Sequence, residues 1–221
     1  DVPVSMMEPI VLAQQVWERP LVDQDDKQIT FATIGAKTGE GALIGNTLID
    51  GLVLALNAVN SEKGGIFGSY RLALDQRDDA GVFARGVGHL REQVQTTPFF
   101  IGVMGEEVVE KAMLPLIQAG TLALLFPPIG GRPVQQGGAL LYFRPSYVDE
   151  LYALIHYTVT TLKKTKIALF HEESGWGLQA RKAAERLLAA HNLTLAGAAS
   201  YQPGTVNVSA AVKAMSDMAP E

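Results

Sequence analysis

The glycine-rich segment Gly35–Asn46, "GAKTGEGALIGN", is the part of the sequence that first suggests ligand binding. It lies between an apolar run and a helical pattern, where backbone N–H groups can face a cleft. A phosphate-binding P-loop requires G-x-x-x-x-G-K-[ST], whereas Lys37 and Thr38 here precede Gly39. A dinucleotide fingerprint requires G-x-G-x-x-G, and Gly39–Gly45 is one residue longer. Taken alone, the segment predicts a tight strand-to-helix turn and no nucleotide cofactor.

Other groups that could do chemistry are scattered along the chain. The histidines show no metal-ligand spacing: His89, His156, His171 and His191. Asp78 and Asp79 end a predicted strand and are interpreted as a solvated turn rather than as paired catalytic acids. The sequence has no Ser–His–Asp order, no G-x-S-x-G motif and no cysteine, which excludes disulfides, thiolate zinc sites and cysteine nucleophiles. We therefore expect no enzyme activity, no metal site and no cofactor.

The composition limits the partners. The 221 residues are 48% hydrophobic, enough for one large or two small cores. The formal net charge is -5 and basic residues form no block, which argues against nucleic acid and anionic membranes. No uninterrupted apolar run reaches the roughly 18 residues of a membrane span, so the sequence predicts no direct membrane span.

From Gln28 onward, predicted strands alternate with predicted helices. This rhythm is typical of βαβ units with parallel sheets covered on both faces. "FPPIGGRPVQQGG" (126–138) interrupts the rhythm and marks a boundary, and "ALLYFRP" (139–145) is expected to be a short strand. The chain ends directly after a helix where another strand is due, so we expect a fragment.

The order of these segments resembles the branched-chain amino-acid (Leu/Ile/Val-binding) type of type I periplasmic substrate-binding protein of ABC transporters. The matching segments are "ITFATIGAKTGEGALIGNTLIDGLVLALNAVNSEKGGIFG", "YRLALDQRDDAG", "FFIGVMGEEVVEKAMLPLIQAGTLALLFPP", "LLYFRPS" and "KIALFHEESGWGLQARKAAERLLA". The resemblance implies a two-lobed α/β fold with doubly wound parallel sheets and a small solute bound in the inter-lobe cleft. It also implies an N-terminal extension (1–27), lobe one (28–144) and part of lobe two (145–221). The second lobe would then be truncated and could self-associate through its incomplete sheet.

The resemblance also implies which residues meet the solute. Ile44 lies where many relatives place an aromatic lid residue, and Trp176 where they carry an aromatic wall of lobe two. The turn at Gly105 and Glu106 supplies a hydroxyl donor in relatives that bind amino acids, and Glu106 takes that place here. The turn "PPIGG", with Pro128, presents a second hydroxyl in relatives, and Gly130 takes its place.

These departures change the expected solute. In the relatives a helix N-terminus and the hydroxyl bind the solute carboxylate, whereas the Glu106 carboxylate can itself occupy that positive helix end. Like charges about 4 Å apart repel by roughly 4 kcal/mol at an effective dielectric near 20. A neutral, hydroxylated or cationic solute is therefore favoured over a plain branched-chain amino acid. The resemblance implies a periplasmic receptor that delivers its solute to an ABC transporter permease. The alternative is a ligand-binding sensor domain of a regulator or receptor kinase, since the same fold serves both.

Overall fold

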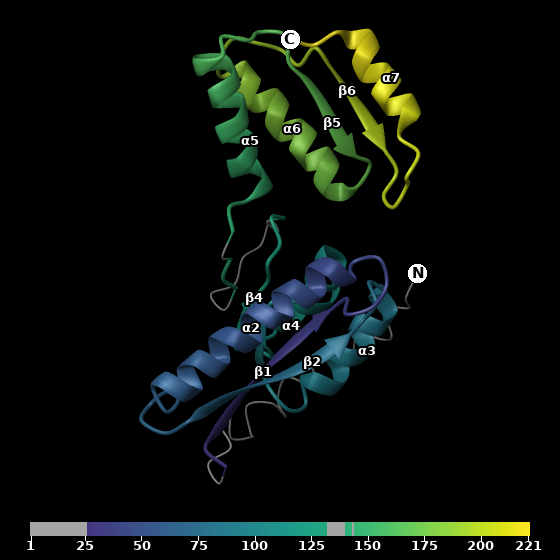
Figure 1. The fold of residues 1–221 in the computed structure, drawn as a ribbon. Coiled ribbons are helices and arrows are strands. Elements are labelled where there is room, and N and C mark those ends of the chain that lie inside the picture. The colour runs from purple at the N-terminus through teal and green to yellow at the C-terminus, as the bar shows by residue number, and fades with distance from the viewer. Residues whose placement is uncertain (1–25, 132–139, 143) are drawn as a thin grey trace. The chain divides into compact units, whose positions relative to one another are not determined.

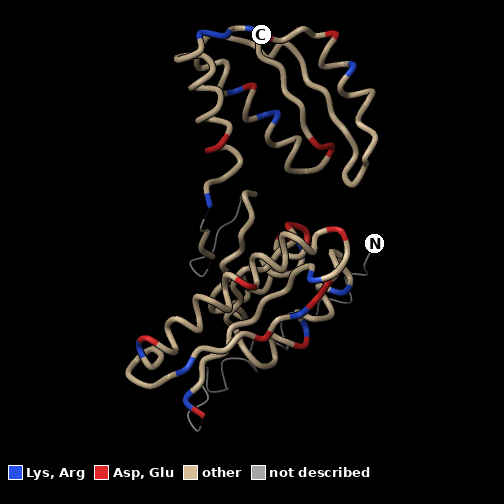
Figure 2. The backbone as a smooth tube through the Cα atoms, in the orientation of Figure 1, with Lys and Arg blue, Asp and Glu red and all other residues tan. Residues whose placement is uncertain are grey.

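Two separate units make up the described part of the chain, which in this computed structural model is residues 26–131, 140–142 and 144–221. Unit 1 comprises the described residues up to Ile129 together with 140–142 and 144. Unit 2 comprises Gly130, Gly131 and Pro145–Glu221. Most of the expected N-terminal extension, residues 1–25, lies outside the described residues. Basic positions are scattered among acidic ones along both units (Figure 2). The extent of the two lobes in the whole protein stays a prediction.

Unit 1 contains a parallel four-stranded sheet with strand order β2-β1-β3-β4. Strands β1, β2 and β4 are labelled in Figure 1. In chain order its elements are β1 (Gln28–Gly35), α2 (Ala42–Glu62), β2 (Arg71–Asp78), α3 (Phe83–Gln93), β3 (Phe99–Ile101), the π-helix η2 (Val108–Met113), α4 (Leu114–Gln118) and β4 (Leu124–Phe126). β1 and β2 pair in parallel from Gln28 opposite Arg71 to Gly35 opposite Asp78. The parallel α/β fold predicted from the rhythm of the sequence is thus confirmed.

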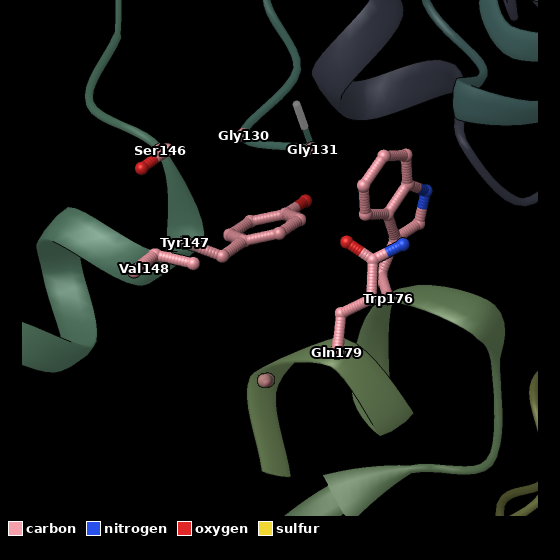
Figure 3. Close-up of a pocket in the computed structure, with 8 residues that line it drawn as sticks. Gly130, Gly131, Ser146, Tyr147, Val148, Trp176 and Gln179 are labelled. Carbon is pink, nitrogen blue, oxygen red and sulfur yellow. The ribbon is translucent and has the colours of Figure 1, made fainter. Parts of the chain in front are cut away.

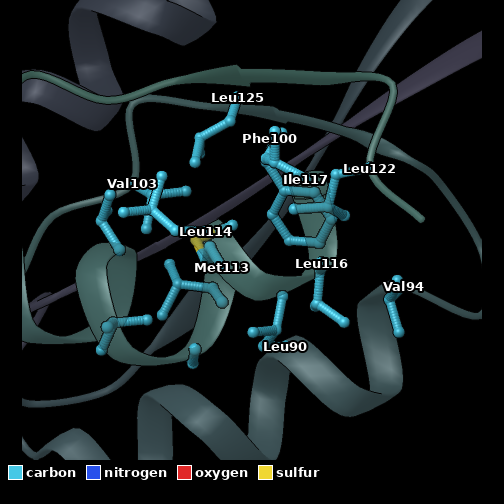
Figure 4. Packing of buried hydrophobic residues seen from close by; sticks show 14 of the residues in the cluster. Leu90, Val94, Phe100, Val103, Met113, Leu114, Leu116, Ile117, Leu122 and Leu125 are labelled. Atoms are coloured by element: carbon cyan, nitrogen blue, oxygen red, sulfur yellow. The ribbon is translucent and has the colours of Figure 1, made fainter. Parts of the chain in front are cut away.

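One apolar core holds unit 1 together (Figure 4). It joins β-strand residues such as Phe100 and Leu125 to α3, η2 and α4, with Leu90 and Met113 among the buried side chains. Burying a large apolar side chain stabilises a fold by about 1.5–3 kcal/mol relative to leaving it exposed. This packing fixes β1 and β3, and β1 holds β2 by strand pairing up to its carboxyl end, so the loops of the candidate site emerge from fixed strand ends.

Helix α2 could cross a membrane by length and apolar composition alone, and little of it is buried in the described structure. Polar residues interrupt the apolar sequence of α2, so this property is not visible as an uninterrupted apolar run. Polar side chains of α2 form hydrogen bonds with neighbouring segments of unit 1. Asn60 exchanges two 2.8 Å hydrogen bonds with the backbone N–H and C=O of Leu72 on the edge strand β2. The Asn46 amide donates to the Lys37 carbonyl at 3.0 Å. These bonds are those of a helix that packs on a sheet.

The segment predicted as a strand at 139–145 forms no strand over its described residues. Leu140 makes only an isolated parallel bridge with Leu125, and Leu141 N–H donates to the Leu125 carbonyl at 2.9 Å. The prediction of a strand here was therefore wrong for the described part. An apolar run shows that residues are buried, and Leu140 is indeed buried, but the run cannot show how many ladder bonds form.

Unit 2 is a parallel pair of strands with helices packed against it (Figure 1). Its elements are α5 (Tyr147–His156), the π-helix η3 (Tyr157–Thr161), β5 (Ala168–Glu172), α6 (Gly175–Ala189), β6 (Gly197–Tyr201) and α7 (Ser209–Met218). Helix α5 begins with a capping box, in which Ser146 Oγ accepts from Asp149 N–H and Asp149 Oδ2 accepts from Ser146 N–H. Ile155, Ala184 and Leu188 form the small buried core of unit 2.

Candidate functional site

The glycine-rich loop after β1 is held by a carboxylate of the neighbouring strand. Asp78, the last residue of β2, accepts hydrogen bonds from Lys37 N–H at 2.8 Å, Thr38 N–H at 3.2 Å and Thr38 Oγ1 at 2.7 Å. It also accepts from Ala80 N–H at 3.0 Å. Two of the loop N–H groups are therefore bound to an internal anion, as is typical of a structural turn.

The hydrogen bonds between Asp78 and the glycine-rich loop predict how the stability of the protein changes at acid pH. The Thr38 hydroxyl and then the Lys37 N–H are the leading causes that hold the pKa of Asp78 well below its usual range. A carboxyl whose pKa is depressed in the folded state stabilises the fold above its ordinary pKa of about 3.9, and this stability is lost as the pH falls. We expect Asp78→Asn to lower the free energy of unfolding at neutral pH, and the difference from wild type to narrow below about pH 4. Chemical denaturation from neutral to acid pH measures this.

Asp50→Asn is the control for that experiment, because Asp50 is exposed on α2 and should change the stability little at any pH. If the difference in the free energy of unfolding between wild type and Asp78→Asn stayed constant down to acid pH, the proposed stabilising role of the Asp78 carboxylate would be contradicted.

A surface hollow of about 290 Å³ opens beside this loop, wholly within unit 1. Its lining comes from the segments that follow β1, β2 and β3 at their carboxyl ends, where ligands bind in open parallel sheets. The residues are Ala36, Gly41, Asp79, Gly81, Phe83, Met104, Gly105, Glu106, Glu107 and Val108. We call this cavity the unit-1 hollow, and it is the candidate functional site of unit 1.

Asp79 is the buried acid of the unit-1 hollow, with 4% of its surface exposed. Its Oδ1 accepts a hydrogen bond from Gly81 N–H at 2.8 Å. Burial raises the pKa of this carboxyl, and the charge of Asp78 adds to the increase, while the Gly81 hydrogen bond and His89 oppose it. The interpretation of Asp79 as a solvated turn was therefore wrong. The sequence pattern shows a polar pair at a strand end, but it does not show that α3 and η2 enclose the second acid.

The remaining charges around the unit-1 hollow are also mainly acidic. Glu106 and Glu107 line it, and Lys111 Nζ binds Glu107 Oε1 at 2.6 Å. Lys111 also lies over the Phe83 ring, 5.9 Å from its centroid. Among the described lining residues there is no Lys or Arg, so the hollow offers carboxylates without a basic lining group.

A smaller hollow of about 40 Å³ lies within unit 2, and we call it the unit-2 hollow. Tyr147, at the start of α5, and Trp176, in the first turn of α6, point toward the Gly130–Gly131 segment, with Gln179 beside them (Figure 3). A Cβ atom added at Gly130 would collide with the Tyr147 ring, and one added at Gly131 would lie 2.5 Å from the Trp176 ring. Gly130 also accepts a hydrogen bond from Tyr147 N–H at 2.9 Å. Both glycines are therefore required by aromatic packing.

The structure divides the six residues that the resemblance singled out. Gly105 and Glu106 line the unit-1 hollow, whereas Gly130 and Trp176 line the unit-2 hollow. Ile44, on the first turn of α2, is 68% exposed, and neither it nor Pro128 lines either hollow. The place of the expected second hydroxyl, at Gly130, is taken by the Tyr147 ring.

Sequence reasoning missed several residues of the two hollows. Asp79 could have been found from its position at the carboxyl end of a predicted strand. Phe83 and Tyr147 follow strand ends or boundaries too, but only the packing shows that their rings reach a hollow. A helix begins at Glu106 as expected, and the six-residue π-helix η2 and the five-residue α4 continue it to Gln118.

Comparison with known proteins gives a consistent family assignment. A family model described as periplasmic binding protein matches residues 28–221. A solved substrate-binding periplasmic protein from Ralstonia solanacearum is 27% identical, with a TM-score of 0.74, and the match covers 85% of this chain and 53% of that chain. A search of curated proteins found no match.

More distant solved structures share the fold. A fatty acid ABC transporter substrate-binding protein from Thermomonospora curvata is 16% identical with a TM-score of 0.74, covering 91% of this chain and 51% of that one. A solute-binding protein of an ABC transporter from R. palustris, in complex with 4-hydroxybenzoate, is 15% identical with a TM-score of 0.72, covering 87% and 52%. The chain thus spans about half the length of these structures.

The family and these relatives are binding proteins rather than enzymes, in agreement with the sequence-based expectation. The named ligands of the relatives differ, so the fold is shared while the ligand is not. The match over residues 28–221, together with parallel sheets whose strand ends open into a hollow, shows that this chain belongs to the periplasmic binding protein family and has its type I fold.

Proposed function

We propose that this chain belongs to the solute-binding receptor of an ABC importer, which works in the periplasm and delivers its solute to the transporter permease. The observation that supports this most is the unit-1 hollow, because it lies at the carboxyl ends of three parallel strands. Solved relatives described as ABC transporter substrate-binding proteins support the same role. The self-association expected from an incomplete second lobe stays a prediction.

The proposed solute is small and polar, and it is unlike a plain branched-chain amino acid. Glu106 lines the unit-1 hollow, and its negative charge would repel a solute carboxylate bound there. Gly130 offers no hydroxyl, because the Tyr147 ring fills the space beside it. The lining therefore favours a neutral, hydroxylated or cationic solute over one recognised through its carboxylate.

Native mass spectrometry of the purified protein, followed by calorimetry with any compound released, tests the receptor function. We expect a small solute that binds one to one and is not converted. A chain that carries no solute, binds none from a broad panel and turns over a substrate instead would overturn the proposal. Micromolar binding of leucine, isoleucine or valine that is unaffected by Glu106→Ser would overturn the proposed solute class alone.

The part of Trp176 in solute binding stays a proposal. Its ring packs on Gly131, which explains its partial burial without any ligand. An aromatic ring that also stacks on a solute contributes about 1 kcal/mol beyond the buried area. A change of Trp fluorescence on solute addition that disappears in Trp176→Ala, with weaker binding, would support the second role.

A further inference from the structure

Asp79, a buried residue of the unit-1 hollow, has one carboxylate oxygen that receives no hydrogen bond from another described residue. Asp79 Oδ1 accepts from Gly81 N–H, but Oδ2 receives no hydrogen bond from another residue in the described structure. Water or a bound molecule must supply the donor for this oxygen, because a carboxylate oxygen left without hydrogen bonds costs free energy. Because Asp79 lines the hollow, a bound molecule can supply that partner.

The charged groups near Asp79 do not satisfy it. Asp78 lies next to it with the same charge and is committed to the glycine-rich loop. The His89 ring approaches the Asp78 carbonyl at 3.0 Å through Nε2 and lowers the pKa of Asp79 only as a minor contribution. Lys111, at the edge of the hollow, is bound to Glu107.

We propose that Asp79 is a specificity-determining residue of the solute site, whose Oδ2 accepts a hydrogen bond from an ammonium or amidinium group of the solute. The unit-1 hollow therefore selects cations. Asp79 makes the direct charge-assisted hydrogen bond, and Glu106 adds to the negative potential of the lining. This inference rests on the proposed receptor function and narrows the solute class from polar to cationic.

The test uses the full chain and matched probes, because the natural solute is not identified. Butyl, isoamyl and benzyl skeletons are each offered as the amine, the alcohol and the carboxylate, and binding is measured by calorimetry at neutral pH. We expect the amine of at least one skeleton to bind about tenfold or more tightly than its alcohol and carboxylate counterparts, since hydrogen bonds between charged groups are the stronger ones. If no amine binds more tightly than both counterparts, the proposal is overturned.

Asp79→Asn should remove the preference for the amine and leave the alcohol unaffected. Asparagine keeps an oxygen for Gly81 N–H and removes a charge that burial disfavours, so the variant should fold, as its thermal midpoint will show. Asp75→Asn is the matched control, because Asp75 lies on the same strand, pairs with Arg77 at 2.9 Å and does not line the hollow. An amine preference that persists in Asp79→Asn, or that is lost equally in Asp75→Asn, would count against the assignment.

The wild type alone gives a second test. A bound cation favours the ionised carboxylate, so the affinity for the amine should rise with pH through the pKa of Asp79, which lies above its ordinary value of about 3.9. An amine affinity that is independent of pH in the acid range would contradict the proposal. A co-purified solute that is anionic would also overturn it, yet it would leave the receptor function in place.

Discussion

Replacing Gly45 by alanine is expected to destabilise unit 1 by about 3 kcal/mol, at the upper end of the usual cost of overpacking. Gly45 lies in the first turn of α2 and is buried. A Cβ atom there would collide with the carbonyl oxygen of Ala36 and lie 2.8 Å from its carbonyl carbon. Because backbone atoms cannot swing aside as a side chain can, the whole start of α2 would have to move away from β1. Urea denaturation of the full chain measures the loss.

Gly51 provides a control in the same helix. It is exposed on α2, and a Cβ atom added there would meet nothing within 4 Å. Alanine is favoured over glycine in a helix interior by about 0.8–1 kcal/mol, so Gly51→Ala should stabilise the protein. If Gly45→Ala lowers the free energy of unfolding and Gly51→Ala raises it, close packing rather than helix propensity requires Gly45. A neutral effect of Gly45→Ala would mean that α2 does not approach β1 as described.

The second large effect is expected for Phe100→Ala in the core of unit 1. Phe100 lies on β3, an inner strand, and is completely buried. Removing such a ring leaves a cavity that the packed sheet and helices cannot fill, at a cost of about 3–5 kcal/mol. The free energy of unfolding of the full chain should fall by this amount, and thermal denaturation should show unit 1 melting first.

Phe67→Ala is the matched control, because Phe67 is 85% exposed and outside the core. Its substitution should change the stability by no more than about 0.5 kcal/mol. Equal losses for Phe67→Ala and Phe100→Ala would contradict the described core.

The sequence predicted the elements of the fold well, because hydrophobic periodicity is a local property. The segment 28–35 was expected to be a strand and is β1, and the parallel arrangement followed from the alternation of strands and helices. The π-helices η2 and η3 could not be predicted, since their side-chain pattern resembles that of an α-helix. The strand expected at 139–145 does not form over its described residues, because the composition shows burial but does not show ladder pairing.

The candidate site could be predicted only in part. Gly105 and Glu106, which were singled out at a strand end in the α/β rhythm, line the unit-1 hollow, and their contact with a solute stays a prediction. Asp79 was dismissed, because its burial depends on helices that are distant from it in sequence. The glycines of Gly35–Asn46 were ambiguous for the same reason. Only the structure shows that Gly45 allows a close approach to Ala36 and that Lys37 and Thr38 bind Asp78.

The packing of Tyr147 and Trp176 on Gly130 and Gly131 has a consequence for protein engineering. Unit 2 is not one continuous stretch of chain, because its two glycines precede the last residues of unit 1. A fragment expressed from Pro145 onward would carry both rings without the backbone that covers them, and it would present fresh apolar surface to other molecules. An excised unit 2 therefore needs these two glycines restored, for example by circular permutation that joins them through a short linker.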